Sequence, residues 1–177
     1  MSIARIIVTM CCVLMLSAVV ASSEPADKGV PDISVEDLKK AIADKKVLLI
    51  DCNGSKSYAN GHIPGAINFE AVKDDIAKVL PKDKAALVVA YCGGPKCGAY
   101  KAGVDAATKQ GYTNVKHFSG GTSGWKEAGE DFEAADLCKK CGQIKGSGIC
   151  CKADQPKCDK CGLAKGSPGC CKLPKKQ

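Results

Sequence analysis

Apolar residues recur in the middle of the chain in two patterns, which predict strands that alternate with helices. Short runs rich in apolar residues are typical of strands buried on both faces of a sheet, and the expected strands are 47–50, 66–69, 87–91 and 114–118. Between them, apolar positions return at helical spacing, and the expected helices are 35–44, 71–80, 99–110 and a short one after 120–121, with a loop at 58–64. This order predicts an α/β fold with a mainly parallel central sheet flanked by helices.

A separate apolar segment occupies residues 1–21. Arg5 gives it a positive start, an apolar run follows, and small residues around Ala21 suit a cleavage site. The run is short for a membrane span, although an uncleaved anchor or lipidation of a cysteine within it is an open alternative. We expect a signal peptide at 1–21 and a polar linker at 22–31. The mature protein is then exported, periplasmic or extracellular, and touches a membrane only through the signal peptide before cleavage.

Composition changes the picture at the C-terminal end. The chain has thirteen Cys, eight of them within residues 138–177. The same segment holds ten Lys against Asp154 and Asp159, a charge of +8, while the whole chain carries +7. It has no Arg and no aromatic residue, the groups that usually read and stack nucleic-acid bases. No nucleic-acid partner is therefore expected.

The segment 135–177, called the tail below, contains the pattern C-x2-C-G-x7-C-C-K twice, at a shift of twenty residues. The eight candidate metal ligands are Cys138, Cys141, Cys150, Cys151, Cys158, Cys161, Cys170 and Cys171. The tail has too few apolar residues for a core, so cross-links must hold this small irregular unit. The C-x2-C-G turn is common in thiolate metal sites, and two four-thiolate sites would suit Zn²⁺ or Cu⁺. Adjacent Cys seldom bind one tetrahedral ion, which leaves sulfurs shared between units, or four disulfides, as alternatives.

A candidate nucleophile follows the expected strand 87–91. Cys92 lies where chemistry gathers in parallel sheets, at the carboxyl end of a strand, and Asp51 lies at the same edge. Loop amides and the start of the next helix are expected to favour a Cys92 thiolate. The expected active-site loop consists of Gly93, Gly94, Pro95, Lys96, Cys97 and Gly98.

Four motifs, in order along the chain, carry a resemblance to a known family. They are Leu49-Ile50-Asp51, then Tyr58 with Gly61-His62-Ile63-Pro64-Gly65-Ala66-Ile67-Asn68, then Tyr91-Cys92, and finally Gly111-Tyr112-Thr113-Asn114-Val115 with Gly120-Gly121 and Trp125. Residues 32–134 thus resemble a rhodanese-like sulfurtransferase domain. The resemblance implies a rhodanese-like fold and a cofactor-free reaction. In that reaction Cys92 takes sulfane sulfur from a small donor, becomes a persulfide and passes the sulfur to a thiol or other nucleophilic acceptor.

The sequence departs from the family pattern around this loop. Asn53 stands where relatives often have Arg, and Cys97-Gly98 stands where they often have Arg-Ser. The anion cradle therefore carries less charge, which leaves open a sulfur donor other than thiosulfate. Cys97 is either a thiol that resolves the persulfide or a residue that packs the loop. The alternative function is a metal-binding or thiol-redox protein on an inactive rhodanese scaffold.

The remaining candidates have structural interpretations. Asp51 is expected to support the loop, and Cys52 to act as a small core residue. His62 lies in a Gly- and Pro-rich turn, which favours a structural role. His117 is expected to be a partly exposed edge residue, and Trp125 a core residue.

Overall fold

The computed structural model describes residues 29–173. The expected signal peptide at 1–21 and most of the linker at 22–31 lie outside the described residues. Within 29–173, no helix combines the length and the hydropathy that a membrane crossing requires.

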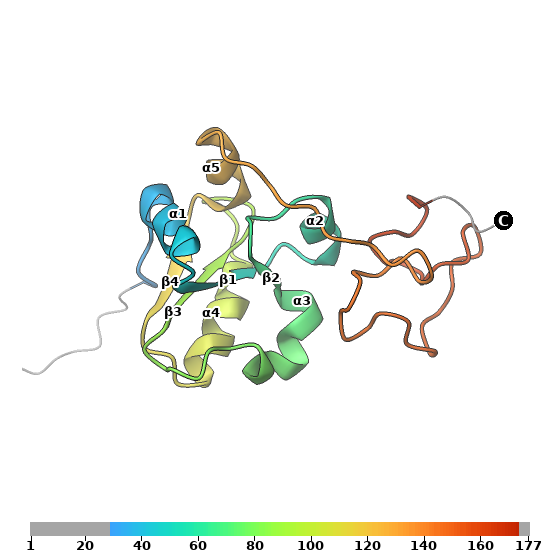
Figure 1. Cartoon of the computed structure of the whole chain (residues 1–177), viewed down its shortest axis with the longest axis horizontal. Coiled ribbons are helices and arrows are strands. Elements are labelled where there is room, and N and C mark those ends of the chain that lie inside the picture. Colours follow the sequence, from blue (N-terminus) through green and yellow to red (C-terminus); the bar gives the residue numbers. More distant parts are fainter. Residues whose placement is uncertain (1–28, 174–177) are drawn as a thin grey trace, which may run out of the picture.

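A four-stranded parallel sheet forms the centre of the body (Figure 1). The strands are β1 (Val47–Asp51), β2 (Ile67–Asn68), β3 (Leu87–Tyr91) and β4 (Val115–Phe118). Their order across the sheet is β2-β1-β3-β4, and every neighbouring pair is parallel. The last four residues of β3 are fully buried, because helices cover both faces of this central strand. The predicted parallel α/β sheet is confirmed.

Helices cover the two faces of the sheet over two separate clusters of buried side chains. The helices are α1 (Val35–Ala43), α2 (Ser55–Asn60), α3 (Phe69–Val72), a 3-10 helix (Lys73–Lys78), α4 (Tyr100–Lys109) and α5 (Gly121–Glu127). Leu38 of α1 and Trp125 of α5 pack on one face. Val104 of α4 and Ile76 of the 3-10 helix pack on the other (Figure 1). Trp125 is a core residue, as predicted.

Two local predictions are wrong. Residues 58–60, expected in a loop, belong to α2, which begins after Gly54 turns the chain at a φ of 81°. The Glu70 carboxylate accepts from the Ser55 amide at 2.6 Å, a contact between distant segments that local patterning does not reveal. The single helix expected at 71–80 is instead α3 followed by the 3-10 helix, with Asp75 outside helical geometry.

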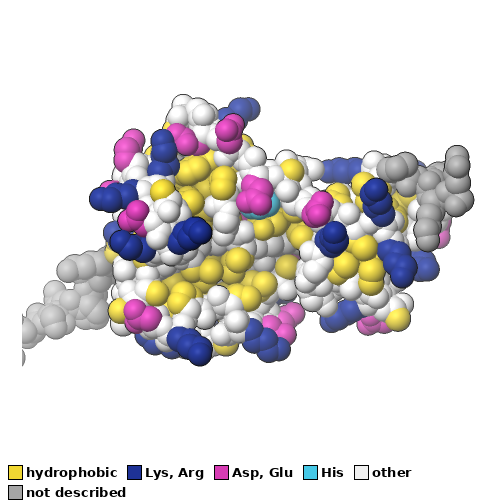
Figure 2. Space-filling model, in the orientation of Figure 1, with side chains coloured by type: hydrophobic (Ala, Val, Ile, Leu, Met, Phe, Trp, Pro, Cys, Tyr) yellow, Lys and Arg dark blue, Asp and Glu magenta, His cyan; other side chains and the backbone are white. Residues whose placement is uncertain are grey.

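The tail lies beyond α5 at one end of the body (Figure 1) and has no regular helix or strand among its described residues. Its second repeat packs on the first. The Ala164 amide donates to the Cys141 carbonyl at 2.9 Å, and the Gly169 amide donates to the Gly142 carbonyl at 2.8 Å. Lys side chains dominate the charged groups on the face of the tail seen in Figure 2. The small irregular tail is thus observed, and its two repeats form one unit.

Candidate functional site

Cys92 lies directly after β3, where the start of α5 holds the loop against the sheet. The Cys92 carbonyl accepts from the Thr122 amide at 2.9 Å. The Gly93 carbonyl accepts from the Ser123 hydroxyl at 2.8 Å. Gly121 makes this approach possible: its φ is 55°, and a Cβ there would lie 2.2 Å from the Cys92 carbonyl oxygen. The Gly120-Gly121 motif therefore lets α5 pack directly on the candidate nucleophile.

The Cys92 thiol is buried, with 1% of the residue exposed. It donates to the Cys97 carbonyl oxygen at 3.1 Å. Burial raises the pKa of the Cys92 thiol, and its hydrogen bond with the Cys97 side chain raises it further. The amides of Tyr100 and Gly94 act in the opposite direction, as expected for a cradle of amides. The expectation of a favoured Cys92 thiolate is nevertheless wrong, because loss of hydration outweighs the amides. That Cys92 is the nucleophile stays a prediction.

Cys97 is the more acidic member of the pair. Its side-chain hydrogen bond with Cys92 lowers the pKa of the Cys97 thiol, and the Ala99 and Gly93 amides lower it further. A turn closed by the Cys97 amide and the Gly94 carbonyl, 2.9 Å apart, brings Cys97 back over the loop. A pocket of about 500 Å³ opens here, and its lining residues are Gly93, Gly94, Pro95, Lys96, Cys97 and Ser123. Cys97 lines this pocket, whereas Cys92 is buried and is not among its lining residues.

A buried hydrogen-bond network supports the site from below. Asp51 accepts from the Asn53 amide at 2.7 Å through one carboxylate oxygen and from the Tyr91 hydroxyl at 2.7 Å through the other. The Tyr91 hydroxyl in turn accepts from the Ile63 amide at 3.0 Å. Burial raises the pKa of Tyr91, and the Asp51 charge adds to that rise. Asp51 therefore makes the contacts expected of a residue that supports the loop. The role of the Tyr91 hydroxyl in this network was not predicted, since a Tyr in an apolar strand gives no sign of a polar partner.

Cys52 and Asn53 follow β1 beside the loop, and their side chains have different surroundings. Asn53, at the position where relatives often have Arg, has a buried side-chain nitrogen without a hydrogen-bond partner. Its side-chain oxygen faces Gly93, where an added Cβ would lie 3.6 Å away. Cys52 packs against the cluster under α4, and burial raises the pKa of its thiol to about 12. This inert setting fits the predicted core role of Cys52.

The two His residues are both buried. His62 contacts the Tyr58 carbonyl through Nδ1 at 2.8 Å and stacks on the Tyr58 ring, in accordance with a structural role. The prediction that His117 is partly exposed is wrong, since 8% of the residue is exposed. β4 is an edge strand as expected, but Tyr100 at the start of α4 stacks on the His117 ring with 3.4 Å between centroids.

The tail gathers its eight Cys into two groups of four, one in each repeat. Within each group all sulfurs lie within 4.8 Å of one another. In the first group, Cys151 Sγ lies 3.6 Å from Cys138, 3.7 Å from Cys141 and 3.8 Å from Cys150. The second group repeats this arrangement, with separations of 3.7 to 3.9 Å for three of its sulfur pairs.

The sulfurs are therefore not shared between units, contrary to that alternative, and the adjacent Cys of each repeat belong to one group. The backbone gives the reason. The second member of each adjacent pair, Cys151 or Cys171, has a φ of 60°. This left-handed conformation is uncommon for residues other than Gly, and here it brings both neighbouring sulfurs to the same centre.

The four sulfurs of each group fit a metal ion in tetrahedral coordination by thiolates. Zn–S bonds of about 2.3 Å place the sulfurs of a tetrahedral site about 3.8 Å apart. The Lys140 and Cys141 amides lower the pKa of Cys138 to about 6, and the corresponding amides of the second repeat do the same for Cys158. All eleven Cys among residues 29–173 are free thiols.

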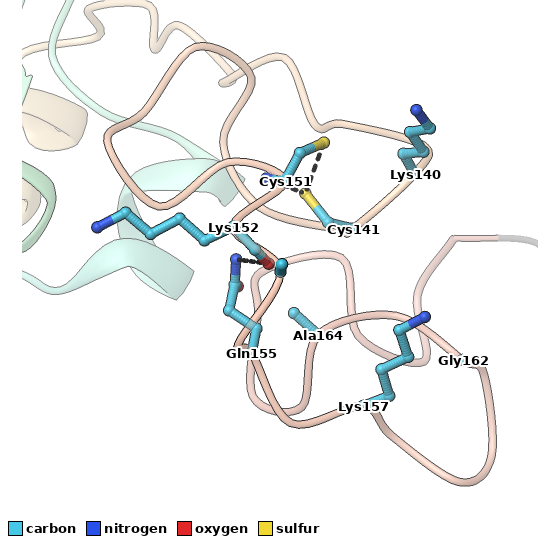
Figure 3. A pocket seen from close by; sticks show the side chains of 9 residues that line it. Lys140, Cys141, Cys151, Lys152, Gln155, Lys157, Gly162 and Ala164 are labelled. Carbon is cyan, nitrogen blue, oxygen red and sulfur yellow. Dashed lines mark hydrogen bonds between the residues drawn. The ribbon is translucent and has the colours of Figure 1, made fainter.

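A pocket of about 390 Å³ separates the two repeats next to the first group (Figure 3). Cys141 and Cys151 of the first repeat line it, and Gly162 and Ala164 of the second face them. The three Lys side chains around it, Lys140, Lys152 and Lys157, point in different directions in Figure 3. They do not converge on a site for an anion.

Comparison with known proteins identifies the body. The family model of the rhodanese-like domain matches residues 34–128, more than half of the chain. Thiosulfate sulfurtransferase GlpE of Shewanella oneidensis is 30% identical over 99 residues, which cover 54% of this chain and 92% of that protein. A tRNA uridine(34) hydroxylase of Buchnera aphidicola is 27% identical over 155 residues, which cover 68% of this chain and 45% of the hydroxylase.

Among solved structures, the BH2092 protein of Bacillus halodurans superposes with a TM-score of 0.52 at 22% identity, covering 59% of this chain and 77% of that one. This likeness supports the fold. The matched residues include β1, β3, the loop after Cys92 and the start of α5, which are the segments that build the site described above. The chain belongs to the family of rhodanese-like domains.

Proposed function

We propose that the protein is a sulfurtransferase that carries sulfane sulfur on Cys92. The observation that supports this most is the position of the Cys92 thiol, which lies directly after β3 and accepts from the amides of Gly94 and Tyr100. In the first step the Cys92 thiolate attacks the sulfane sulfur of a small donor. The donor's bond to that sulfur breaks, its remainder leaves with the electron pair, and Cys92 holds a persulfide. In the second step an acceptor thiolate attacks the outer sulfur and Cys92 is released.

The Cys92–Cys97 pair supplies the thiolate that the first step needs. The Cys92 thiol donates to the Cys97 carbonyl oxygen at 3.1 Å, and each thiol shifts the pKa of the other. With one proton on the pair, the negative charge resides on Cys97, whose pKa is lowered. Transfer of the Cys92 proton to Cys97 then produces the nucleophile inside the amide cradle when the donor arrives.

Mass spectrometry of the intact protein tests this proposal. After incubation with thiosulfate or with an inorganic polysulfide, the wild type is expected to gain one sulfur atom, which cyanide removes as thiocyanate. Cys92→Ser is expected to gain none, while Cys52→Ser, altered at a buried neighbouring thiol, behaves like the wild type. Sulfur transfer by Cys92→Ser at the wild-type rate would contradict the proposal.

We propose a second, independent function for the tail, the binding of two Zn²⁺ ions. Sulfur separations of 3.6 to 3.9 Å, repeated in both groups, support it because they match the edge of a tetrahedral ZnS₄ site. Four thiolates in each group leave no open position, which is typical of structural sites. Cys138, Cys141, Cys150 and Cys151 would hold one ion, and the other four would hold the second. Cu⁺ is the rival ion for an all-thiolate site.

Elemental analysis of protein purified under reducing conditions tests the tail. Two zinc ions per chain are expected, with one remaining in Cys141→Ser and one in Cys161→Ser. Competition between Zn²⁺ and Cu⁺, followed by native mass spectrometry, identifies the preferred ion. A mass that corresponds to four disulfides, with no metal bound, would contradict the proposal.

If the tail binds metal and Cys92 forms no persulfide, the alternative of an inactive rhodanese scaffold with a metal-binding or thiol-redox role is favoured. We also propose export of the protein, with residues 1–21 removed, on the basis of the N-terminal sequence pattern. The N-terminal mass of the mature protein recovered from cells tests this. Retention of Met1 in an intracellular fraction would contradict it.

A further inference from the structure

We propose that Cys97 resolves the Cys92 persulfide within the loop, which forms a Cys92–Cys97 disulfide and releases hydrosulfide. The inference rests on the proposed persulfide at Cys92 and extends it. It gives the site a second outcome besides sulfur transfer, namely the reduction of sulfane sulfur to hydrosulfide by two thiols of the same chain.

The loop brings Cys97 to the pocket while Cys92 stays buried beneath it. The Cys92 Sγ contacts the Cys97 carbonyl oxygen at 3.1 Å, and the Cys97 amide is held by the Gly94 carbonyl at 2.9 Å. Each thiol also shifts the pKa of the other. Cys97 lines the pocket above the loop, whereas 1% of Cys92 is exposed. An outer sulfur on Cys92 therefore meets Cys97 before it meets an external thiol.

The reaction balances without an added oxidant. The Cys97 thiolate attacks the inner sulfur of the persulfide, that is, Cys92 Sγ. The Sγ–Sγ bond forms while the bond between Cys92 Sγ and the outer sulfur breaks, and the outer sulfur leaves as hydrosulfide with the electron pair. The two Cys sulfurs are oxidised to a disulfide, and the sulfane sulfur is reduced to sulfide. An external thiol, the reductant class that this cycle needs, reopens the disulfide by exchange.

Attack on the inner sulfur is favoured over attack on the outer one. Attack on the outer sulfur would expel the Cys92 thiolate, and burial raises the pKa of that thiol. The group with the lower pKa leaves faster in thiol–disulfide exchange, so hydrosulfide is the better leaving group. The lowered pKa of Cys97 also increases the fraction of this thiol that is in the attacking thiolate form. The residue that replaces the family's Arg thus contributes a nucleophile in place of a positive charge.

Single-turnover loading of the full-length protein under anaerobic conditions tests the inference. Reduced protein, with its tail saturated with zinc, receives one equivalent of inorganic polysulfide and is then alkylated, digested and analysed by mass spectrometry. Released hydrosulfide is trapped with a bimane reagent. The wild type is expected to release a further equivalent of hydrosulfide per persulfide lost and to yield a peptide pair linked through Cys92 and Cys97.

Three variants separate this inference from the proposed function. Cys97→Ser is expected to form the persulfide more slowly than the wild type, because it lacks the Cys97 proton acceptor, but to keep it about tenfold longer or more, with no linked peptide. Cys92→Ser is expected to show neither species, and Cys52→Ser to behave like the wild type. A wild-type persulfide as long-lived as that of Cys97→Ser would overturn the inference and leave the proposed function standing. If neither the wild type nor Cys97→Ser formed a persulfide or released hydrosulfide, the proposed function itself would be overturned.

Discussion

The active loop holds two thiols in unequal environments, with the pKa of Cys97 lowered and that of Cys92 raised. Cys92 is buried beneath the loop, and Cys97 lines the pocket above it. Hydrogen bonds from backbone amides act on both sulfurs, but loss of hydration dominates at Cys92 and not at Cys97. At the scale of single residues, the thiol proposed to carry sulfur and the thiol with the lowered pKa are therefore different groups.

Alkylation with iodoacetamide is expected to label Cys97 first. A thiol with a lowered pKa holds a larger thiolate fraction at a given pH, so the labelling rate of Cys97 should reach its half-maximum below the ordinary value of 9.0. Cys92 and Cys52, with raised pKa values, should reach theirs above it. Peptide mass spectrometry across a pH series, on zinc-saturated protein, measures the three rates. Preferential labelling of Cys92 at neutral pH would refute this order.

The sequence predicted the position of Cys92 but not its burial. A strand, a Gly-rich loop and a helix start are local patterns, so the carboxyl-edge site and its amides followed from them. The closeness of α5 is a contact between segments about thirty residues apart, so the Gly120-Gly121 motif indicated a turn but not its contact with Cys92. The same reason applies to the Tyr91 hydroxyl, whose partners Asp51 and Ile63 lie on other segments.

Among the elements, α4 connects the active loop to the sheet. Its N-terminus lies at the loop, and Gly103 in its middle lies against β1 and β3. A Cβ on Gly103 would lie 2.9 Å from Cys52 Sγ and 3.2 Å from the Cβ of Ala90. The close packing of helix on sheet at this point explains why a helix interior carries Gly, a residue that costs about 1 kcal/mol relative to Ala there.

Gly103→Ala is expected to destabilise the body by about 1–2 kcal/mol, because overpacking outweighs the gain in helix propensity. Urea unfolding followed by Trp125 fluorescence measures the loss. Cys52→Ala added to Gly103→Ala should recover part of it, since the closest contact is then removed. Gly98→Ala is the matched control, because an added Cβ there meets nothing within 4 Å. Stability equal to or above the wild type in Gly103→Ala would show that the helix moves freely away from the sheet.

The contact between α4 and β4 makes part of the stability depend on pH. Burial lowers the pKa of His117, while the nearby Asp32 opposes that shift. The folded chain therefore binds this proton less tightly than the unfolded chain, whose His has a pKa of about 6.5. The contribution of His117 to the free energy of unfolding is complete above pH 6.5. It is lost as the pH falls through 6.5 toward the lower pKa of the folded state.

His117→Gln is accordingly expected to lose less stability than the wild type between about pH 7.5 and pH 5.5. Urea midpoints at the two pH values give the comparison, and Lys116→Gln on the same strand serves as the control for a changed charge. Equal losses in the wild type and His117→Gln would contradict the assigned role. The sequence predicted the strand and its edge position, but not the Tyr100 ring that buries the imidazole, since that ring arrives from α4.

At the scale of the whole molecule, body and tail are stabilised by different means. Every buried residue of the two apolar clusters lies between Ile33 and Trp125. The tail adds few apolar residues, and its eight Cys form two groups that fit metal ions. Contacts between the two parts include a hydrogen bond from Lys172 to the Asn60 side chain at 2.8 Å and another between the Ala135 amide and the Ala59 carbonyl at 3.4 Å.

Removal of metal from the full-length protein is therefore expected to unfold the tail and to leave the body intact. For small thiolate sites, metal binding supplies the free energy of folding, whereas the body depends on its own core. Trp125 is the single Trp of the chain and is buried in that core, so its fluorescence reports the body alone. After treatment with a strong zinc chelator under reducing conditions, the fluorescence midpoint of thermal unfolding should shift by a few degrees at most. Amide exchange in residues 138–173 should meanwhile become fast.

A chain that ends at Asp136 provides the matched comparison, because it keeps the core and the Ala135 contact but has no ligand Cys. It should unfold at nearly the same temperature as the chelated protein and bind no zinc. Suppose instead that chelation unfolds the tail and lowers the fluorescence midpoint of the body to the same extent. The tail would then be part of the cooperative unit of the body. The Lys172–Asn60 contact would then belong to a larger interface that the metal sites hold in place. Retention of the midpoint would make the tail a separate metal-dependent unit, attached to the rhodanese-like body at α2.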